Sequence, residues 1–240
     1  MAQAVFRAQP VSEQYAPVGR RTTTRTMSLT RALLLCGAIA GPLFIVTVLI
    51  QDYTRAGFDP RLHALSLLSL GEWGWVQIAN FVLAGVLNLL YAAGLWRALH
   101  PGRAGTWGPL LIGAYGIGLI TVGVFTTDPT NGFPPGAVAA TEPSGHGVVH
   151  ALGGLFVFVV LTAALSVFVR LLLARMQRGW AFYCLASAVL LPVLFFGGIS
   201  NPLLMARTLR LATLIGWMAA SMVAVKLLSA PDAARHTREQ

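Results

Sequence analysis

Two histidines, His146 and His150, lie four residues apart in the segment SGHGVVH, at the entrance to a long apolar run. In a helix such residues share a face, with Cβ atoms roughly 5–6 Å apart. This spacing suits two ligands of one metal ion, but a catalytic zinc ion usually has three protein ligands. His63 and Asp128 are the candidates for the remaining positions. Asp128 is also the candidate catalytic residue, as a general base to zinc-bound water.

A structural role is the alternative for the same histidines. The segment between His146 and His150 contains no glutamate, so the zinc-protease motif, in which a glutamate follows the first histidine, is absent. His146 could be a solvated residue at the membrane surface, and His150 could bond to an amide such as Asn80. Zinc binding and hydrogen bonding therefore both stay open for these two side chains.

A row of polar side chains follows one apolar segment. Gln77, Asn80, Asn88 and Tyr91 recur at helical spacings, which places them on one face of a helix. Because an unpaired amide is costly in hydrocarbon, we expect this face to point into a helix bundle. The amides could either bond between helices or line a polar cavity. In the second case, Gln77, Asn80 and Asn88 are candidate ligand-binding residues.

Two arginines near the last apolar segment, Arg207 and Arg210, are spaced three residues apart. Their guanidinium groups could hold an anionic lipid head group. They could equally neutralise Asp128 or Glu142. Arg207 and Arg210 therefore complete the set of candidate ligand-binding residues.

The composition of the chain indicates which secondary-structure elements carry these residues. The chain of 240 residues is 56% hydrophobic and 10% charged, whereas soluble domains carry about 25% charged residues. A bilayer-spanning helix needs about 20 mostly apolar residues. The sequence predicts an all-α integral membrane bundle of six transmembrane helices. The six apolar segments are Ala32–Ile50, Val76–Trp96, Thr106–Thr127, Gly147–Val169, Gly179–Ile199 and the shorter Leu211–Val225.

The distribution of charge predicts the orientation of this bundle. Lysine and arginine collect in cytoplasmic loops. Here they collect in both tails and in the second and fourth connections, while the first and third connections hold acidic residues. We therefore expect both termini in the cytoplasm and a location in the inner or plasma membrane. The arginines are dispersed and belong to no recognition motif, so no nucleic acid partner is expected despite a net charge of +9.

The same patterns divide the chain into three parts. Residues 1–30 are expected to form a disordered basic cytoplasmic tail, residues 31–229 the six-helix transmembrane domain, and residues 230–240 a second cytoplasmic tail. The expected orientation brings polar residues from distant segments to the non-cytoplasmic side. These residues are His63, Gln77, Asn80, Asp128, His146, His150, Arg207 and Arg210.

Four segments occur in an order that resembles a known family. They are GFDPRLHALSLLSLGEWGWVQIANF, GTWGPLLIGAYGIGLITVGVFTTDP, GFPPG and HGVVH. In this order they resemble the bacterial membrane-protein family catalogued as domain of unknown function 998. The resemblance spans roughly residues 30–225. It implies a multi-helix integral membrane protein and no particular activity.

The sequence therefore indicates a multi-pass membrane protein of unassigned activity. Its polar non-cytoplasmic face could bind a lipid head group or a small molecule. The alternative is a metal-dependent intramembrane hydrolase that acts on a lipid-like substrate. Besides the lipid bilayer, an anionic lipid or small-molecule ligand is a candidate partner, and the oligomeric state stays open.

Overall fold

A computed structural model describes residues 19–139, 141–201 and 203–229 of the chain. Within these residues six long helices and one short 3-10 helix form, without a named strand. The expected all-α six-helix fold is confirmed. The elements are α1 (Gly19–Thr54), η1 (Leu65–Ser69), α2 (Gly74–Leu99), α3 (Arg103–Val124), α4 (Gly145–Ala174), α5 (Arg178–Ser200) and α6 (Met205–Leu228).

Each long helix contains a segment that is long and apolar enough to cross a membrane. In α1 this segment is Leu29–Thr54. The chain is therefore a multi-pass membrane protein whose helices lie in a lipid bilayer. The last helix begins at Met205, before the apolar segment expected from Leu211. Arg207 and Arg210 consequently belong to the first turns of α6.

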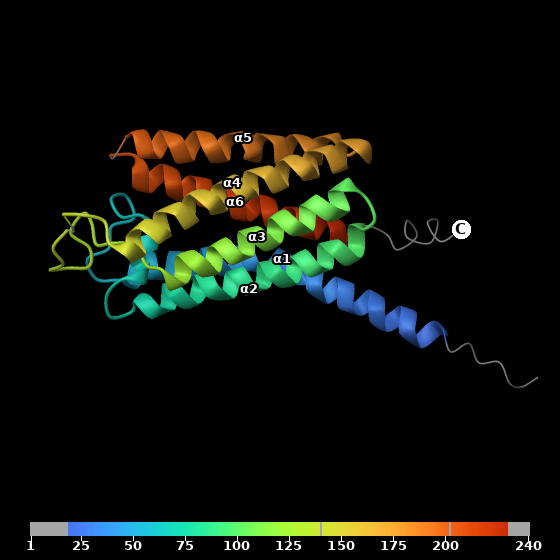
Figure 1. The fold of residues 1–240 in the computed structure, drawn as a ribbon, viewed down its shortest axis with the longest axis horizontal. Coiled ribbons are helices and arrows are strands. Elements are labelled where there is room, and N and C mark those ends of the chain that lie inside the picture. The colour runs from blue at the N-terminus through green and yellow to red at the C-terminus, as the bar shows by residue number, and fades with distance from the viewer. Residues whose placement is uncertain (1–18, 140, 202, 230–240) are drawn as a thin grey trace, which may run out of the picture.

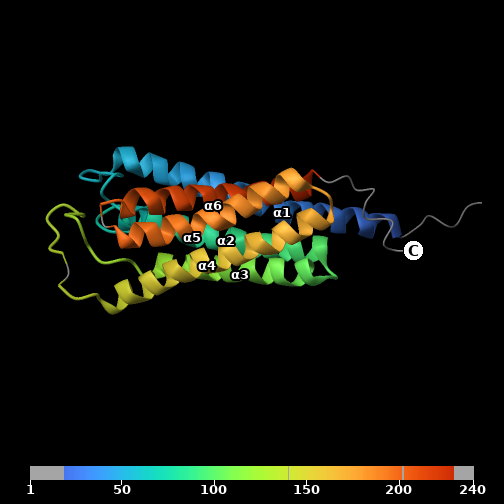
Figure 2. The same cartoon turned by 90° about the horizontal axis from the view of Figure 1, so that it is seen from above.

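The six helices lie side by side, and their connections gather at two ends (Figures 1 and 2). One end holds the α1–α2 connection with η1, the α3–α4 connection and the α5–α6 turn. We call it the loop end. The opposite end holds the start of α1, the end of α6 and the two short connections α2–α3 and α4–α5. We call it the terminal end.

The helices form a closed ring in chain order. Each helix packs against the next one, and α6 packs against α1. Aromatic side chains fill the middle of this ring. Trp217 of α6 stacks on Phe44 of α1 with ring centroids 4.9 Å apart, and Tyr115 of α3 meets it edge-on at 5.5 Å.

The closest helix pair depends on two glycines. A Cβ atom added to Gly85 of α2 would lie 2.6 Å from the carbonyl oxygen of Gly116 in α3, and one added to Gly116 would lie 2.8 Å from that of Gly85. The two backbones therefore touch where no side chain could fit. Such small-residue contacts are a common way for membrane helices to pack.

The tails differ from the sequence expectation in one respect. Helix α1 begins at Gly19, so helical structure starts well before the expected domain boundary at residue 31. Its first turns extend past the other helices at the terminal end (Figure 1). Residues 1–18 and 230–240, which include most of the two expected tails, lie outside the described residues.

Candidate functional site

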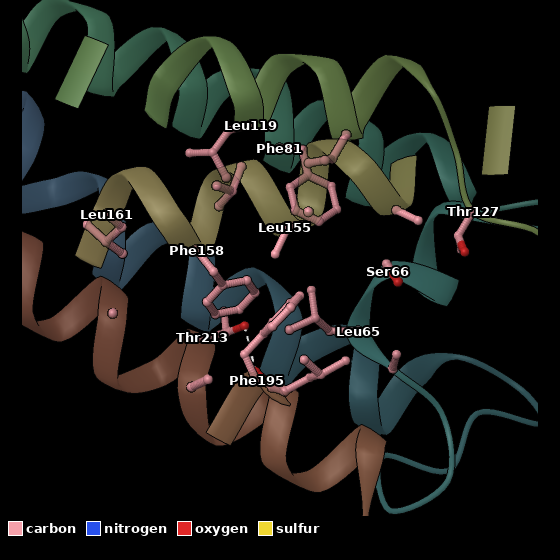
Figure 3. Close-up of a pocket in the computed structure, with 18 of the residues that line it drawn as sticks. Leu65, Ser66, Phe81, Leu119, Thr127, Leu155, Phe158, Leu161, Phe195 and Thr213 are labelled. Atoms are coloured by element: carbon pink, nitrogen blue, oxygen red, sulfur yellow. Dashed lines mark hydrogen bonds between the residues drawn. The ribbon is translucent and has the colours of Figure 1, made fainter. Parts of the chain in front are cut away.

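The loop-end half of the ring encloses a pocket of about 370 Å³. All six helices contribute to its wall, and so do η1 and the segment that follows α3. The lining consists mostly of apolar side chains such as Phe81, Leu119 and Phe158, which point into it (Figure 3). Sequence reasoning missed this site because its residues are ordinary apolar side chains of membrane helices. A pocket of this size falls within the range of small-molecule sites.

The pocket ends in the middle of the bundle. Leu161 lies at the opposite end of the close-up from Ser66 and Thr127 (Figure 3), and the lining residue Gly216 packs beside it. Trp217 and Leu161 are almost fully buried. The space is therefore closed toward the terminal end by packed side chains.

The pocket opens sideways, between α4 and α5. Three of its lining residues, Ala151 and Leu155 of α4 and Ile199 of α5, are exposed. The two helices meet at the terminal end and diverge toward the loop end in both views (Figures 1 and 2). All three residues belong to membrane-spanning helices.

Hydroxyl groups mark the loop end of the pocket. Ser66 of η1 lines the pocket, as do Thr127 and Thr130 of the α3–α4 connection. Their side chains have no hydrogen-bond partner among the residues that the structure describes. By contrast, the hydroxyl of Thr213 donates to the carbonyl oxygen of Leu209 at 2.8 Å. The lining contains no Asp, Glu, Lys, Arg or His side chain.

His63 holds two loops together beside this pocket. Its Nδ1 accepts a hydrogen bond from the backbone N–H of Asp59 at 2.9 Å. The proton therefore sits on Nε2, which donates to the carbonyl oxygen of Asn131 at 3.0 Å. The ring packs between Phe58 and Phe133, with centroids 5.3 and 5.4 Å away. Both ring nitrogens are occupied, which leaves neither for a metal ion.

His150 bonds to the end of the neighbouring helix. Its Nδ1 lies 3.0 Å from the carbonyl oxygen of Val122 and 2.8 Å from that of Phe125. The carbonyls of a last helical turn lack partners within the helix, and His150 supplies a donor to them. Asn80, the partner considered from the sequence, donates instead to the carbonyl oxygen of Phe44.

Asp128 caps helix α4. Its carboxylate accepts the backbone N–H of Ser144 at 2.9 Å, and the Ser144 hydroxyl in turn accepts the N–H of Gly147 at 3.0 Å. A negative charge at a helix N-terminus is favourable. Hydrogen bonds from Ser144 to the ionised form hold the pKa of Asp128 below its ordinary value. His146 is exposed, its ring lies 5.2 Å from that of Phe125, and it interacts electrostatically with Asp128.

The four candidate metal ligands are therefore not brought together as one site. Within residues 19–139, 141–201 and 203–229, no group of three or more His, Cys, Asp or Glu side chains could hold a metal ion. The physical reason is that His63, His150 and Asp128 already bond to backbone groups of loops and helix ends. The candidate catalytic residue Asp128 does not line the pocket either.

The amide row on α2 faces the bundle interior, as expected, since Gln77, Asn80 and Asn88 are all buried. The Gln77 Oε1 accepts hydrogen bonds from Gln51 of α1 at 2.7 Å and from Asn80 at 3.3 Å. Asn88 donates to the carbonyl oxygen of Ala84 in its own helix at 2.8 Å. None of the three candidate ligand-binding amides lines the pocket. Gln77 and Asn80 bond to α1, whereas Asn88 bonds within α2, and Gln51 is the partner that sequence reasoning missed.

Arg210 forms an ion pair with Asp52 that connects α6 to α1. The side chains are 17% and 5% exposed, respectively. The arginine thus neutralises Asp52, and not Asp128 or Glu142 as considered from the sequence. Arg207 is exposed, and no interaction of its side chain is found in the described part of the chain.

We predict that the Arg210→Leu variant loses stability because Asp52 becomes an unpaired buried carboxylate. Breaking a buried pair typically costs about 3–5 kcal/mol. The Asp52→Asn/Arg210→Leu double variant should recover most of this loss, and Arg207→Leu should stay within about 0.5 kcal/mol of wild type. Unfolding free energies in detergent provide the measurement. Similar losses for Arg207→Leu and Arg210→Leu would rule out the pair as the cause.

Asp128 provides a prediction on pH. Since the pKa of its carboxyl is lowered in the folded protein, its stabilising effect is present above the ordinary value of 3.8 and is lost as pH falls through the lower folded value. Asp128→Asn should therefore lower the melting temperature at pH 7, and the difference from wild type should shrink in strong acid. Glu142→Gln, in the same connection, is the control. A pH-independent effect of Asp128→Asn would contradict this cause.

Among the comparisons with known proteins, one protein family matches the chain. Residues 38–227 match the family described as "Protein of unknown function (DUF998)". No curated protein and no solved structure matches the chain. The matched region begins within α1, ends within α6 and includes every residue that lines the pocket. The resemblance seen in the sequence is thus confirmed, and the chain belongs to the family described as protein of unknown function (DUF998).

Proposed function

We propose that this protein binds the hydrocarbon chain of a membrane amphiphile, which enters the pocket sideways from the bilayer. The observation that carries the proposal is the opening between α4 and α5. Leu155 and Ile199 are 37% and 54% exposed and at the same time line the pocket. An acyl chain of a neighbouring lipid can therefore reach the pocket without crossing water.

The size of the pocket suits one chain. The volume of about 370 Å³ falls within the range of small-molecule sites and leaves room for a hydrocarbon chain. An empty apolar space forfeits the dispersion contacts of the atoms that line it. An inserted chain restores these contacts, and this gain favours occupation even though lipid tails are as apolar as the pocket.

The closed inner end supports binding over transport. A transport path would continue toward the terminal end past the deeper polar residues of α2. Asn88 and Tyr91 do not line the pocket, and the lining residue Trp217 is almost fully buried. The metal-dependent hydrolase has no comparable support, because none of His63, His146, His150 and Asp128 lines the pocket.

We further propose that the loop end faces away from the cytoplasm, in an inner or plasma membrane. Charge supports this orientation. All five acidic residues in the described part of the chain lie at the loop end, whereas the connections at the terminal end carry only basic charges. Cytoplasmic connections collect lysine and arginine. The acidic residues are Asp52, Asp59, Glu72, Asp128 and Glu142.

The orientation can be tested by cysteine labelling in intact cells, with Cys36 and Cys184 replaced by alanine. Val138→Cys places a thiol at an exposed position of the α3–α4 connection. It should react with a membrane-impermeant maleimide. Ala174→Cys, at the exposed terminal end of α4, should react only after the membrane is opened. The reverse pattern would invert the proposed orientation.

Gly154 provides a test of the pocket itself. It lines the pocket, and a Cβ atom there would meet nothing within 4 Å, so Gly154→Leu should fill space without a clash. Native mass spectrometry of protein taken from membranes into nanodiscs should show one retained amphiphile per wild-type chain and much less in this variant. Gly179→Leu, an equally open helical position outside the pocket, is the control. Equal retention in both variants would refute binding in this pocket.

A further inference from the structure

We infer that the bound amphiphile carries a small uncharged head group that both donates and accepts hydrogen bonds, such as the hydroxyl of a long-chain alcohol. This inference rests on the proposed function and names the chemical class of its ligand. The head group would lie at the loop end of the pocket, beside Ser66, Thr127 and Thr130. The chain would extend from there toward Leu161.

The polar side-chain groups of the pocket wall are the hydroxyls of Ser66, Thr127, Thr130, Thr213 and Tyr115 and the indole N–H of Trp217. Ser66 and Thr127 lie at the same end of the pocket, opposite Leu161 (Figure 3). The hydroxyls of Ser66, Thr127 and Thr130 have no hydrogen-bond partner in the part of the chain that the structure describes. A hydroxyl donates one hydrogen bond and accepts two. These three side chains thus match an alcohol, which has the same capacity.

A charged head group finds no counter-charge in this wall. No ionisable side chain of Asp, Glu, Lys, Arg or His lines the pocket, and a charge transferred from water to apolar surroundings without a partner is strongly disfavoured. A phospholipid head group could not enter without this cost. The uncharged wall thus favours binding of neutral amphiphiles over charged and zwitterionic lipids.

Two charged residues near the pocket, Arg210 and Asp128, already have hydrogen-bond partners. Arg210 is paired with Asp52 and lines only a separate small space of about 30 Å³, which shares Phe44, Leu65 and Thr213 with the pocket wall. Asp128 follows the pocket residue Thr127 directly and is held at the start of α4 by Ser144. Its carboxylate does not line the pocket, and its negative charge disfavours an anionic head group nearby.

Three photoreactive probes with one dodecyl chain test the inference on the full chain in nanodiscs. Each carries a diazirine near the chain end, and the head groups are hydroxyl, sulfonate and trimethylammonium, which keep their charge at any working pH. The readout is the ratio of labelling at Leu155 and Leu161, in the pocket, to labelling at the lipid-facing Val189 and Val193 of α5. This ratio corrects for how much of each probe the bilayer contains.

The hydroxyl probe should give a ratio about tenfold above those of both charged probes, because a charge loses its solvation in the pocket. A sulfonate or trimethylammonium ratio equal to that of the hydroxyl probe, or above it, overturns the inference and leaves the proposed function intact. If all three probes label the pocket no more than the outer surface, the proposed function itself fails and the inference falls with it.

Variants locate the head group. Ser66→Ala/Thr127→Val should reduce the ratio of the hydroxyl probe by about two- to tenfold, the effect of losing an ordinary hydrogen bond, while charged probes should not change. Thr121→Val is the matched control, since the Thr121 hydroxyl bonds to Ile117 of its own helix and lies outside the pocket. Melting temperatures confirm that each variant is folded. A folded double variant with an unchanged ratio would contradict the assigned position of the head group.

Discussion

Inside a bilayer no water satisfies a polar group, so a polar side chain between the helices is stabilised only by partners in the protein. Several such pairs join neighbouring helices, although some atoms, such as the Nε2 of Gln77 and the hydroxyl of Tyr91, have no partner in the described part of the chain. Asp52 of α1 and Arg210 of α6 pair across the point where the ring closes. Gln51 and Gln77 join α1 to α2, and His150 of α4 bonds to the carbonyls at the end of α3. Polar contacts thus connect α1 to α6 and to α2, and α4 to α3.

The pocket lies where such contacts are missing. Between the loop-end parts of α4 and α5, the described residues form no side-chain hydrogen bond or ion pair, and the helices diverge (Figures 1 and 2). Apolar side chains facing this gap leave a volume of about 370 Å³. The loops that cover it are fixed by His63, whose two ring nitrogens bond to Asp59 and Asn131. The loops at the end of the pocket are therefore tied to each other, whereas no such contact among the described residues joins α4 to α5 beside it.

The sequence predicts the membrane helices and the inward face of α2 because both depend on short-range patterns. A run of apolar residues must span the bilayer, and the spacing of Gln77, Asn80 and Asn88 places them on one face whatever surrounds the helix. No short-range pattern in the sequence predicts which distant residue a polar side chain bonds to. Arg210 bonds to Asp52, 158 residues away, and no spacing within α6 indicates which acidic residue it meets.

The histidines show the same limit. The spacing of four residues places His146 and His150 on one helix, but the atoms that His63 and His150 contact are backbone carbonyls and a backbone N–H, which nearly every residue possesses. The pocket is hidden from sequence reasoning for a related reason. Its apolar lining is chemically the same as a lipid-facing surface, and only the divergence of two helices turns it into a cavity. Gly154 is the one signal, since it leaves the wall of α4 without a side chain.

The most direct test of lateral chain binding is an experimental structure of the protein, obtained by cryo-electron microscopy in nanodiscs made from the host's own membrane lipids. Our account predicts elongated density that enters between Leu155 and Ile199 and ends against Leu161 and Trp217. A structure in which α4 packs against α5 at the loop end and closes the opening would contradict it. An open but empty pocket would contradict it equally.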